Sequence, residues 1–116
     1  MPLPSPSHIV GWHAHVYFDT DRRDAALRLR EAIAAEFGER IALGRVHERP
    51  VGPHPLGSFQ LSIGPADFAA AIGWLSIHHG TPDILVHPDT GDALRDHRDR
   101  AIWIGRSHTL DLAVFG

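Results

Sequence analysis

The strongest constraint on the fold is the strict alternation of the segment IVGWHAHVYFD, residues 9–19. Apolar side chains at every second position predict a strand that buries one of its two faces. The face expected to meet the core carries Trp12, Ala14, Val16 and Phe18. The opposite face carries His13, His15 and Tyr17. A single strand therefore separates a hydrophobic surface from a surface rich in imidazole.

The rest of the chain predicts two main helices and three further strands. A helix is expected over residues 21–37, where apolar residues recur at helical spacing and Gly38 follows as a stop. A second helix opens at Pro65 and ends at Gly80. The expected strands cover residues 40–49, residues 58–63 and the segment PDILVHPDTGD, which also contains a turn. A short helical or irregular piece, DALRDHRDR, leads into a C-terminal hairpin that turns near Gly105 and Ser107.

The order β-α-β-β-α-β matches the ferredoxin-like motif, an α+β fold in which both helices cover one face of an antiparallel sheet. The first strand then lies between the third and the fourth, and the second lies at an edge. With 116 residues the chain is expected to form one domain over residues 1–116, with residues 1–8 as a flexible lead-in.

Polar side chains gather on the sheet face that the two helices leave open. Alternation places there His13, His15, Tyr17, Arg45, His47, Arg49, Ser58, Gln60, Ser62 and His87. Neighbouring strands lie about 4.8 Å apart, and an imidazole nitrogen binds a metal ion at about 2.0–2.2 Å. Histidine is also the side chain that titrates near neutral pH. The open face is therefore predicted to carry a metal site or an acid–base site.

Each of these histidines also has a purely structural interpretation. A His-x-His pair on a strand is often solvated, His87 at a strand end is compatible with a bond to the backbone, and His47 with a plain surface position. His54 lies in the stiff stretch RVHERPVGPHPLGSFQL between two prolines, which suits a loop that carries function. The histidines expected at the surface or at helix caps are His8, His78, His79 and His97, and His108 stays undecided.

Composition excludes several classes of function. The chain has no cysteine, which removes disulfides, thiolate metal sites and cysteine nucleophiles. The net charge is −3 and the basic residues are interleaved with acids, so nucleic acid is not an expected partner. No apolar run reaches the roughly 18 residues that span a bilayer. The N-terminus lacks the pattern of a signal peptide, so a cytoplasmic location is expected.

Four segments together resemble the DOPA 4,5-dioxygenase family: WHAHVYFD (12–19), LGRVHERPVGPHPLGSFQL (43–61), HHGTPDILVHPDTGD (78–92) and DHRDRAIWIG (96–105). The resemblance runs over about residues 10–116, and GPHP and LVHP are its most distinctive parts. It implies a ferredoxin-like fold and extradiol cleavage of a catechol such as DOPA by dioxygen. The implied cofactor is a mononuclear non-haem iron(II).

The resemblance also implies roles for individual residues. The metal ligands would be His15, His87 and, as the third, His13. A facial site of two histidines and one carboxylate would need Glu48, which alternates to the wrong face, so the third ligand stays open between His13, His47, Glu48 and another residue. The acid–base residues would be His54 and His47. The substrate contacts would be Arg45, Arg49, Tyr17 and Gln60, with an arginine pairing with a substrate carboxylate.

Two other functions fit the same residues. The first is a non-catalytic small-molecule-binding module on a dimeric ferredoxin-like scaffold, in which a second subunit covers the open face. The second is a metal-independent isomerase or cofactor-free oxygenase that rests on His54 and Tyr17 alone. A homodimer is expected in any case, because an exposed sheet face with apolar neighbours favours association.

Overall fold

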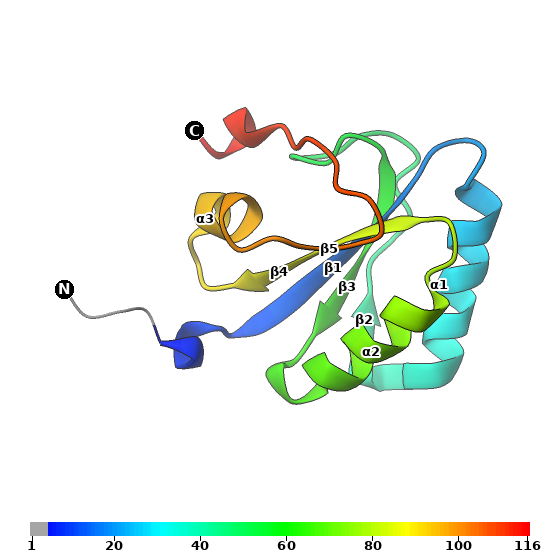
Figure 1. Ribbon diagram of the computed structural model, residues 1–116, viewed down its shortest axis with the longest axis horizontal. Coiled ribbons are helices and arrows are strands. Elements are labelled where there is room, and N and C mark those ends of the chain that lie inside the picture. The colour runs from blue at the N-terminus through cyan, green and yellow to red at the C-terminus, as the bar shows by residue number, and fades with distance from the viewer. Residues whose placement is uncertain (1–4) are drawn as a thin grey trace.

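The computed structural model describes residues 5–116 as a five-stranded antiparallel sheet with the order β2-β3-β1-β4-β5 (Figure 1). The strands are β1 (Gly11–Phe18), β2 (Ile41–Leu43), β3 (Gly57–Ile63), β4 (Asp83–Asp89) and β5 (Ile102–Ile104). The helices are α1 (Arg23–Phe37), α2 (Phe68–His78) and the short α3 (Ala93–Arg98). The predicted α+β fold is confirmed, with β1 between β3 and β4 and with β2 at an edge.

Helices α1 and α2 cover one face of the sheet, and the core lies between them and the strands (Figure 1). The core side chains from the strands include Ala14, Val16, Phe18, Phe59, Leu61, Ile63, Ile84 and Val86. Helix α1 contributes the predicted stripe of Ala26, Leu29, Ile33 and Phe37 and ends at Gly38, whose φ is 55°. The hydrophobic alternation of β1 therefore fixes which face meets the helices, and its histidines point the other way.

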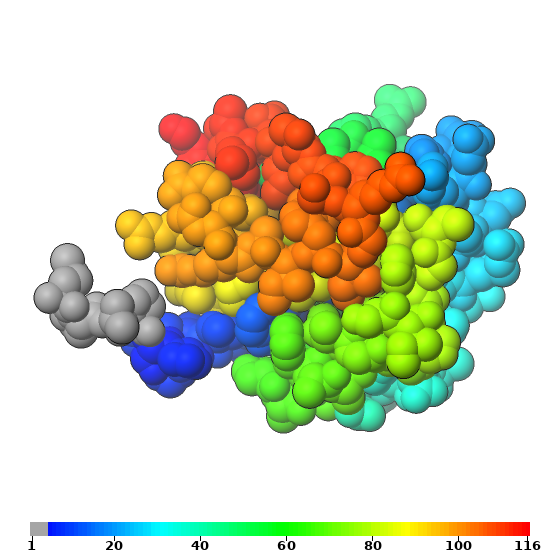
Figure 2. Space-filling view, in the orientation of Figure 1, coloured from blue at the N-terminus to red at the C-terminus, as the bar shows by residue number. Residues whose placement is uncertain are grey.

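The opposite face of the sheet is covered as well, which corrects the expectation of an open face. Helix α3, the C-terminal segment and the loop before β3 lie on the side away from α1 and α2 (Figure 1). In the space-filling view, α3 and the residues that follow it form one continuous surface (Figure 2). The cover is held by the backbone N–H of Asp111, which donates to the carbonyl of Pro53 at 2.9 Å. His15, Tyr17 and His87 are consequently 4%, 1% and 3% exposed.

The predicted strand over residues 40–49 is wrong beyond Leu43. Leu43 pairs with Leu61, and the chain pairs again only at His47, which faces Ser58. Residues 44–46 lie between the two pairs on this segment, whereas only residues 59 and 60 lie between them on β3. The extra residue makes a β-bulge. The bulge interrupts the alternation that was expected to place Arg45, His47 and Arg49 on one face.

The predicted C-terminal hairpin is wrong too. Strand β5 pairs only with β4, and a 3-10 turn over Leu112–Phe115 follows instead of a return strand. The carboxylate of Asp83 redirects the chain, because it accepts hydrogen bonds from the backbone N–H of Arg106 and from Nε2 of His108, both at 2.9 Å.

At the N-terminus, the part of the predicted lead-in that the structure describes contains one 3-10 turn, Pro6–His8, while residues 1–4 lie outside the described residues. None of the helices described is both long and apolar enough to cross a membrane.

Candidate functional site

Five histidines from four parts of the chain meet on the sheet face opposite α1 and α2. Strand β1 supplies His13 and His15, and β4 supplies His87, which lies directly across from His13 in the antiparallel register. The loop before β3 supplies His54, and α3 supplies His97. The structure groups their ligand atoms into two sets that share His15: His13, His15 and His87, and His15, His54 and His97. Within each set all ligand atoms lie within 4.8 Å of one another.

The tightest pair in this cluster is His15 with His87. Their Nε2 atoms lie 3.0 Å apart. Nδ1–H of His87 donates to the carbonyl of Pro88 at 2.8 Å, which leaves a lone pair on Nε2 of His87. Two ligands that meet an ion at right angles, each about 2.1 Å away, lie about 3.0 Å apart. The pair is therefore spaced either for a hydrogen bond from His15 to His87 or for two adjacent positions around one metal ion.

Burial and mutual repulsion keep the imidazoles of His13, His15 and His87 neutral. Burial lowers the pKa of His15 well below its usual value, and His54, His87 and His13 lower it further by charge repulsion. Burial also lowers the pKa of His87 to about 4 and lowers that of His13. Metal ions bind the neutral imidazole and not the imidazolium. At neutral pH these three side chains are thus in the form that a metal ion requires.

His54 forms a second pair, with Tyr17. Nδ1 of His54 and the phenol oxygen of Tyr17 lie 2.6 Å apart, and both side chains are buried. Burial lowers the pKa of His54 to about 4 and raises the pKa of Tyr17 above its usual value. At neutral pH the imidazole is uncharged and the phenol keeps its proton. The ring of His54 lies 4.1 Å from the ring of His15, centroid to centroid, so the pair is next to the possible metal site.

A cavity of about 240 Å³ opens beside these pairs. Its lining residues are His15, His47, Val51, Gly52, Pro53, His54, Ser58 and Gln60. Pro53 and Gly52 belong to the stiff loop of the sequence GPHP, which therefore holds His54 over the sheet as expected. The cavity combines a few polar side chains with the imidazoles of His15, His47 and His54, which is a composition suited to a small polar molecule.

Several residues predicted for the site lie elsewhere. Arg45 and Arg49 are exposed and line a separate cavity of about 360 Å³, which shares His47 and Val51 with the first. Glu48 is exposed and forms a salt bridge with Arg23 at 2.7 Å, away from the histidines. A carboxylate from Glu48 therefore does not reach the cluster, whereas His13 does.

Sequence reasoning missed His97. The side chain lies on α3, its ring centroid is 3.9 Å from that of His87, and its ring is tilted by 37° to that of Phe115, 4.7 Å away. The sequence signal was its place in DHRDRAIWIG, one of the segments that carry the family resemblance. His108, which was left undecided, pairs with Asp83 at 2.9 Å.

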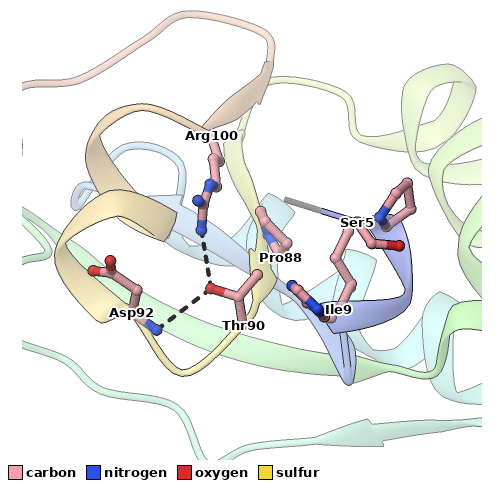
Figure 3. A pocket seen from close by; sticks show the side chains of 8 residues that line it. Ser5, Ile9, Pro88, Thr90, Asp92 and Arg100 are labelled. Carbon is pink, nitrogen blue, oxygen red and sulfur yellow. Dashed lines mark hydrogen bonds between the residues drawn. The ribbon is translucent and has the colours of Figure 1, made fainter. Parts of the chain in front are cut away.

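A larger cavity, about 450 Å³, lies outside the histidine cluster, between the N-terminal 3-10 turn and the segment after β4 (Figure 3). It is lined by Ser5, Pro6, His8, Ile9, Pro88, Thr90, Asp92 and Arg100. Its walls are mostly apolar, and none of the five clustered histidines lines it.

Comparison with known proteins identifies the family to which this chain is similar. The Dopa 4,5-dioxygenase family matches residues 12–114. The chain is 41% identical over 92% of its length to DOPA 4,5-dioxygenase of Amanita muscaria, and it spans about half the length (50%) of that relative. It is 40% identical over 96% of its length to an uncharacterized 21.2 kDa protein of Botryotinia fuckeliana, of which it covers 67%.

A solved structure matches over nearly the whole of both chains. The crystal structure of a proposed dioxygenase from Nostoc punctiforme PCC 73102 superposes with a TM-score of 0.92 at 41% identity. The match covers 97% of this chain and 96% of that one. The fold therefore occurs in a chain of similar length.

Proposed function

The chain belongs to the Dopa 4,5-dioxygenase family, and from that membership we propose that it is a non-haem iron(II) dioxygenase that opens a catechol ring by extradiol cleavage. The observation that carries the proposal is the buried set of neutral imidazoles, with Nε2 of His15 and Nε2 of His87 held 3.0 Å apart. Such a pair does not stabilise a hydrophobic core. A metal ion could bind Nε2 of His87 without displacing a proton, because the proton of that ring is on Nδ1.

In this proposal His15 and His87 bind the iron and His13 is the third ligand. Their ligand atoms lie within 4.8 Å of one another, so one ion can contact all three. With three protein ligands, a bound iron(II) would keep positions for a catechol and dioxygen, would acidify a catechol hydroxyl and would bring the two reactants together.

His54 is the proposed acid–base residue. Burial lowers the pKa of His54 to about 4, so its imidazole is neutral at pH 7 but is a weak base, which would accept a proton only from a catechol hydroxyl that bound iron has acidified. In this proposal Nδ1–H of His54 donates to the phenol oxygen of Tyr17, 2.6 Å away, which orients the ring and leaves the lone pair on Nε2 for the substrate. His47 lies on the wall of the same cavity, half-buried, and is placed to pass the proton on.

The substrate is proposed to enter the cavity of about 240 Å³, where Gln60 and Ser58 offer hydrogen bonds. A catechol with an acidic side chain, such as DOPA, would extend past His47 into the adjoining cavity. Arg45 and Arg49 line that second cavity and can pair with a carboxylate there. Their exposure means that they select the substrate rather than take part in the chemistry.

The test is oxygen uptake by anaerobically prepared, iron-loaded protein on addition of a catechol. The proposal predicts one dioxygen consumed per ring and a ring-opened product, and no reaction in the presence of a chelator. His15→Ala should abolish turnover with an unchanged circular dichroism spectrum. His78→Ala is the control, because His78 is an exposed histidine on α2, outside the cluster.

Full activity of metal-free protein would contradict the proposal and favour the cofactor-free alternative. Saturable binding of catechols without turnover under any metal would favour the binding-module alternative. A homodimer and a cytoplasmic location stay predictions, and sedimentation analysis of the purified protein tests the first.

A further inference from the structure

His97 is held with its ligand nitrogen toward the other histidines. Nδ1–H donates to the carbonyl of Ala93 at 2.7 Å, one helical turn earlier, so the lone pair is on Nε2. The ring lies between those of His87 and Phe115, with centroid distances of 3.9 Å and 4.7 Å. Its ligand atom falls within 4.8 Å of those of His15 and His54. The exposed His78 has the same bond to the preceding turn, so the observation specific to His97 is that its ligand atom lies close to those of His15 and His54.

Helix α3 cannot hold this position by itself. It has six residues, and so short a helix is unstable without tertiary support. The support comes from Asp96, which precedes His97 and is 2% exposed. Its carboxylate accepts hydrogen bonds from the backbone N–H and the hydroxyl of Thr90, both at 2.8 Å, and from Nη1 of Arg100 at 2.9 Å.

These three residues form a closed unit between β4 and the end of α3. Arg100 also donates to the hydroxyl of Thr90 at 2.9 Å, as Figure 3 shows from the side of the large cavity. Burial alone would raise the pKa of Asp96, but the bonds from Thr90 and Arg100 hold that pKa below its usual value. The carboxylate is therefore charged and fully hydrogen-bonded. Its bonds to Thr90 connect α3 to the end of β4, the strand that carries His87.

We infer that His97 is a further metal-binding residue of the histidine centre and that Asp96, clamped by Thr90 and Arg100, is its positioning residue. The inference rests on the proposed metal-dependent function. It adds a ligand from a helix outside the sheet at His15, the ligand on β1 that the two sets of histidines share. It also assigns a positioning role to the ion pair between Asp96 and Arg100. Ion pairs of this kind contribute little to stability by themselves.

The test is anaerobic titration of metal-free protein with Co²⁺, followed by visible absorption, which reports both affinity and coordination without turnover. His97→Ala should weaken Co²⁺ binding by about 10- to 100-fold or more. Loss of a residue that only hydrogen-bonds to a metal ligand already lowers metal affinity by about 10- to 100-fold. Asp96→Asn should weaken it by about tenfold and alter the absorption spectrum, although every ligand is still present.

Matched controls separate these effects from general damage. Like His97, His78 donates from Nδ1 to the carbonyl one turn earlier, at 2.9 Å. It lies on α2, away from the cluster, so the His78→Ala variant should bind Co²⁺ like the unaltered protein. Asp99→Asn is the control for Asp96, because Asp99 is exposed and bonds only Arg98. If Asp96→Asn fails to fold, Thr90→Val removes one bond to the same carboxylate and should give a smaller loss in the same direction.

The outcomes distinguish this inference from the proposed function. Unchanged affinity and spectrum in His97→Ala would overturn the inference and leave the proposed function standing. Unchanged binding in both Asp96→Asn and Thr90→Val would remove the positioning role of Asp96. If the unaltered protein binds no divalent ion, the proposed function and the inference fall together.

Discussion

Acidification should destabilise the metal-free protein well above the pH at which carboxylates titrate. The groups responsible are His54 and His87, whose pKa values in the folded chain are about 4 because the rings are buried. In the unfolded chain the same imidazoles titrate near pH 6.5. Between these values the unfolded state binds more protons than the folded state, so the free energy of unfolding falls as the pH falls.

The size of the effect follows from the two pKa values. Between pH 7 and pH 5, one group whose pKa drops from 6.5 to about 4 on folding costs about 2 kcal/mol of stability. His54 and His87 together would cost about 4 kcal/mol if they titrate independently. His15 acts in the same direction, because its pKa is lowered further still. The loss is a large part of the 5–15 kcal/mol that stabilises an ordinary domain.

Urea denaturation of metal-free protein across this pH range, followed by tryptophan fluorescence, measures the effect. His54→Gln keeps a hydrogen-bonding side chain but does not titrate, so it should remove about 2 kcal/mol of the pH dependence. Saturating metal should hold the native state at pH values where the metal-free protein is already unfolding. A free energy of unfolding that changes by less than about 1 kcal/mol from pH 7 to pH 5 would refute the buried, neutral cluster.

Four further substitutions test the fold and the site. Phe59→Ala should cost about 3–5 kcal/mol in urea denaturation, because Phe59 is fully buried in the core. Gly57→Ala should cost about 1–3 kcal/mol, since a Cβ there would lie 2.7 Å from the ring of Phe18. Glu48→Gln should leave metal affinity unchanged and cost less than about 1 kcal/mol, because its ion pair with Arg23 is exposed. Tyr17→Phe should lower turnover by about 10- to 100-fold with metal affinity intact, and a steady-state assay that found full turnover would remove Tyr17 from the mechanism.

The sheet and its polarity could be predicted because they depend on local alternation. Once Ala14 and Val16 face the helices, the histidines of β1 must face away, and the same holds for His87 beside Val86. A register error of one residue would expose the whole core, so the pattern admits only one arrangement. This is why the first two proposed ligands lie together as the sequence predicted.

The cover over the histidines could not be predicted in the same way. It depends on contacts between segments far apart in sequence, such as the bond from Asp111 to Pro53 and the packing of Phe115 on His97. The bulge before His47 likewise has no local signal, because a single extra residue does not change the apolar pattern visibly. His97 was missed for this reason: in a short polar helix a histidine has the pattern of a surface residue.

A cluster of buried imidazoles is costly for the apo fold, and that cost is itself an argument for a ligand. Polar rings lose hydration on burial, which costs free energy even where their nitrogens form hydrogen bonds inside the protein. Apolar side chains in the same places would give a more stable domain, so the cluster contributes nothing to folding that a core residue could not. A ligand that binds only the native state stabilises it by about 2.7 kcal/mol when present at 100 times its dissociation constant. Iron bound at His15 and His87 would therefore offset much of the cost, and the fold and the metal site would depend on each other.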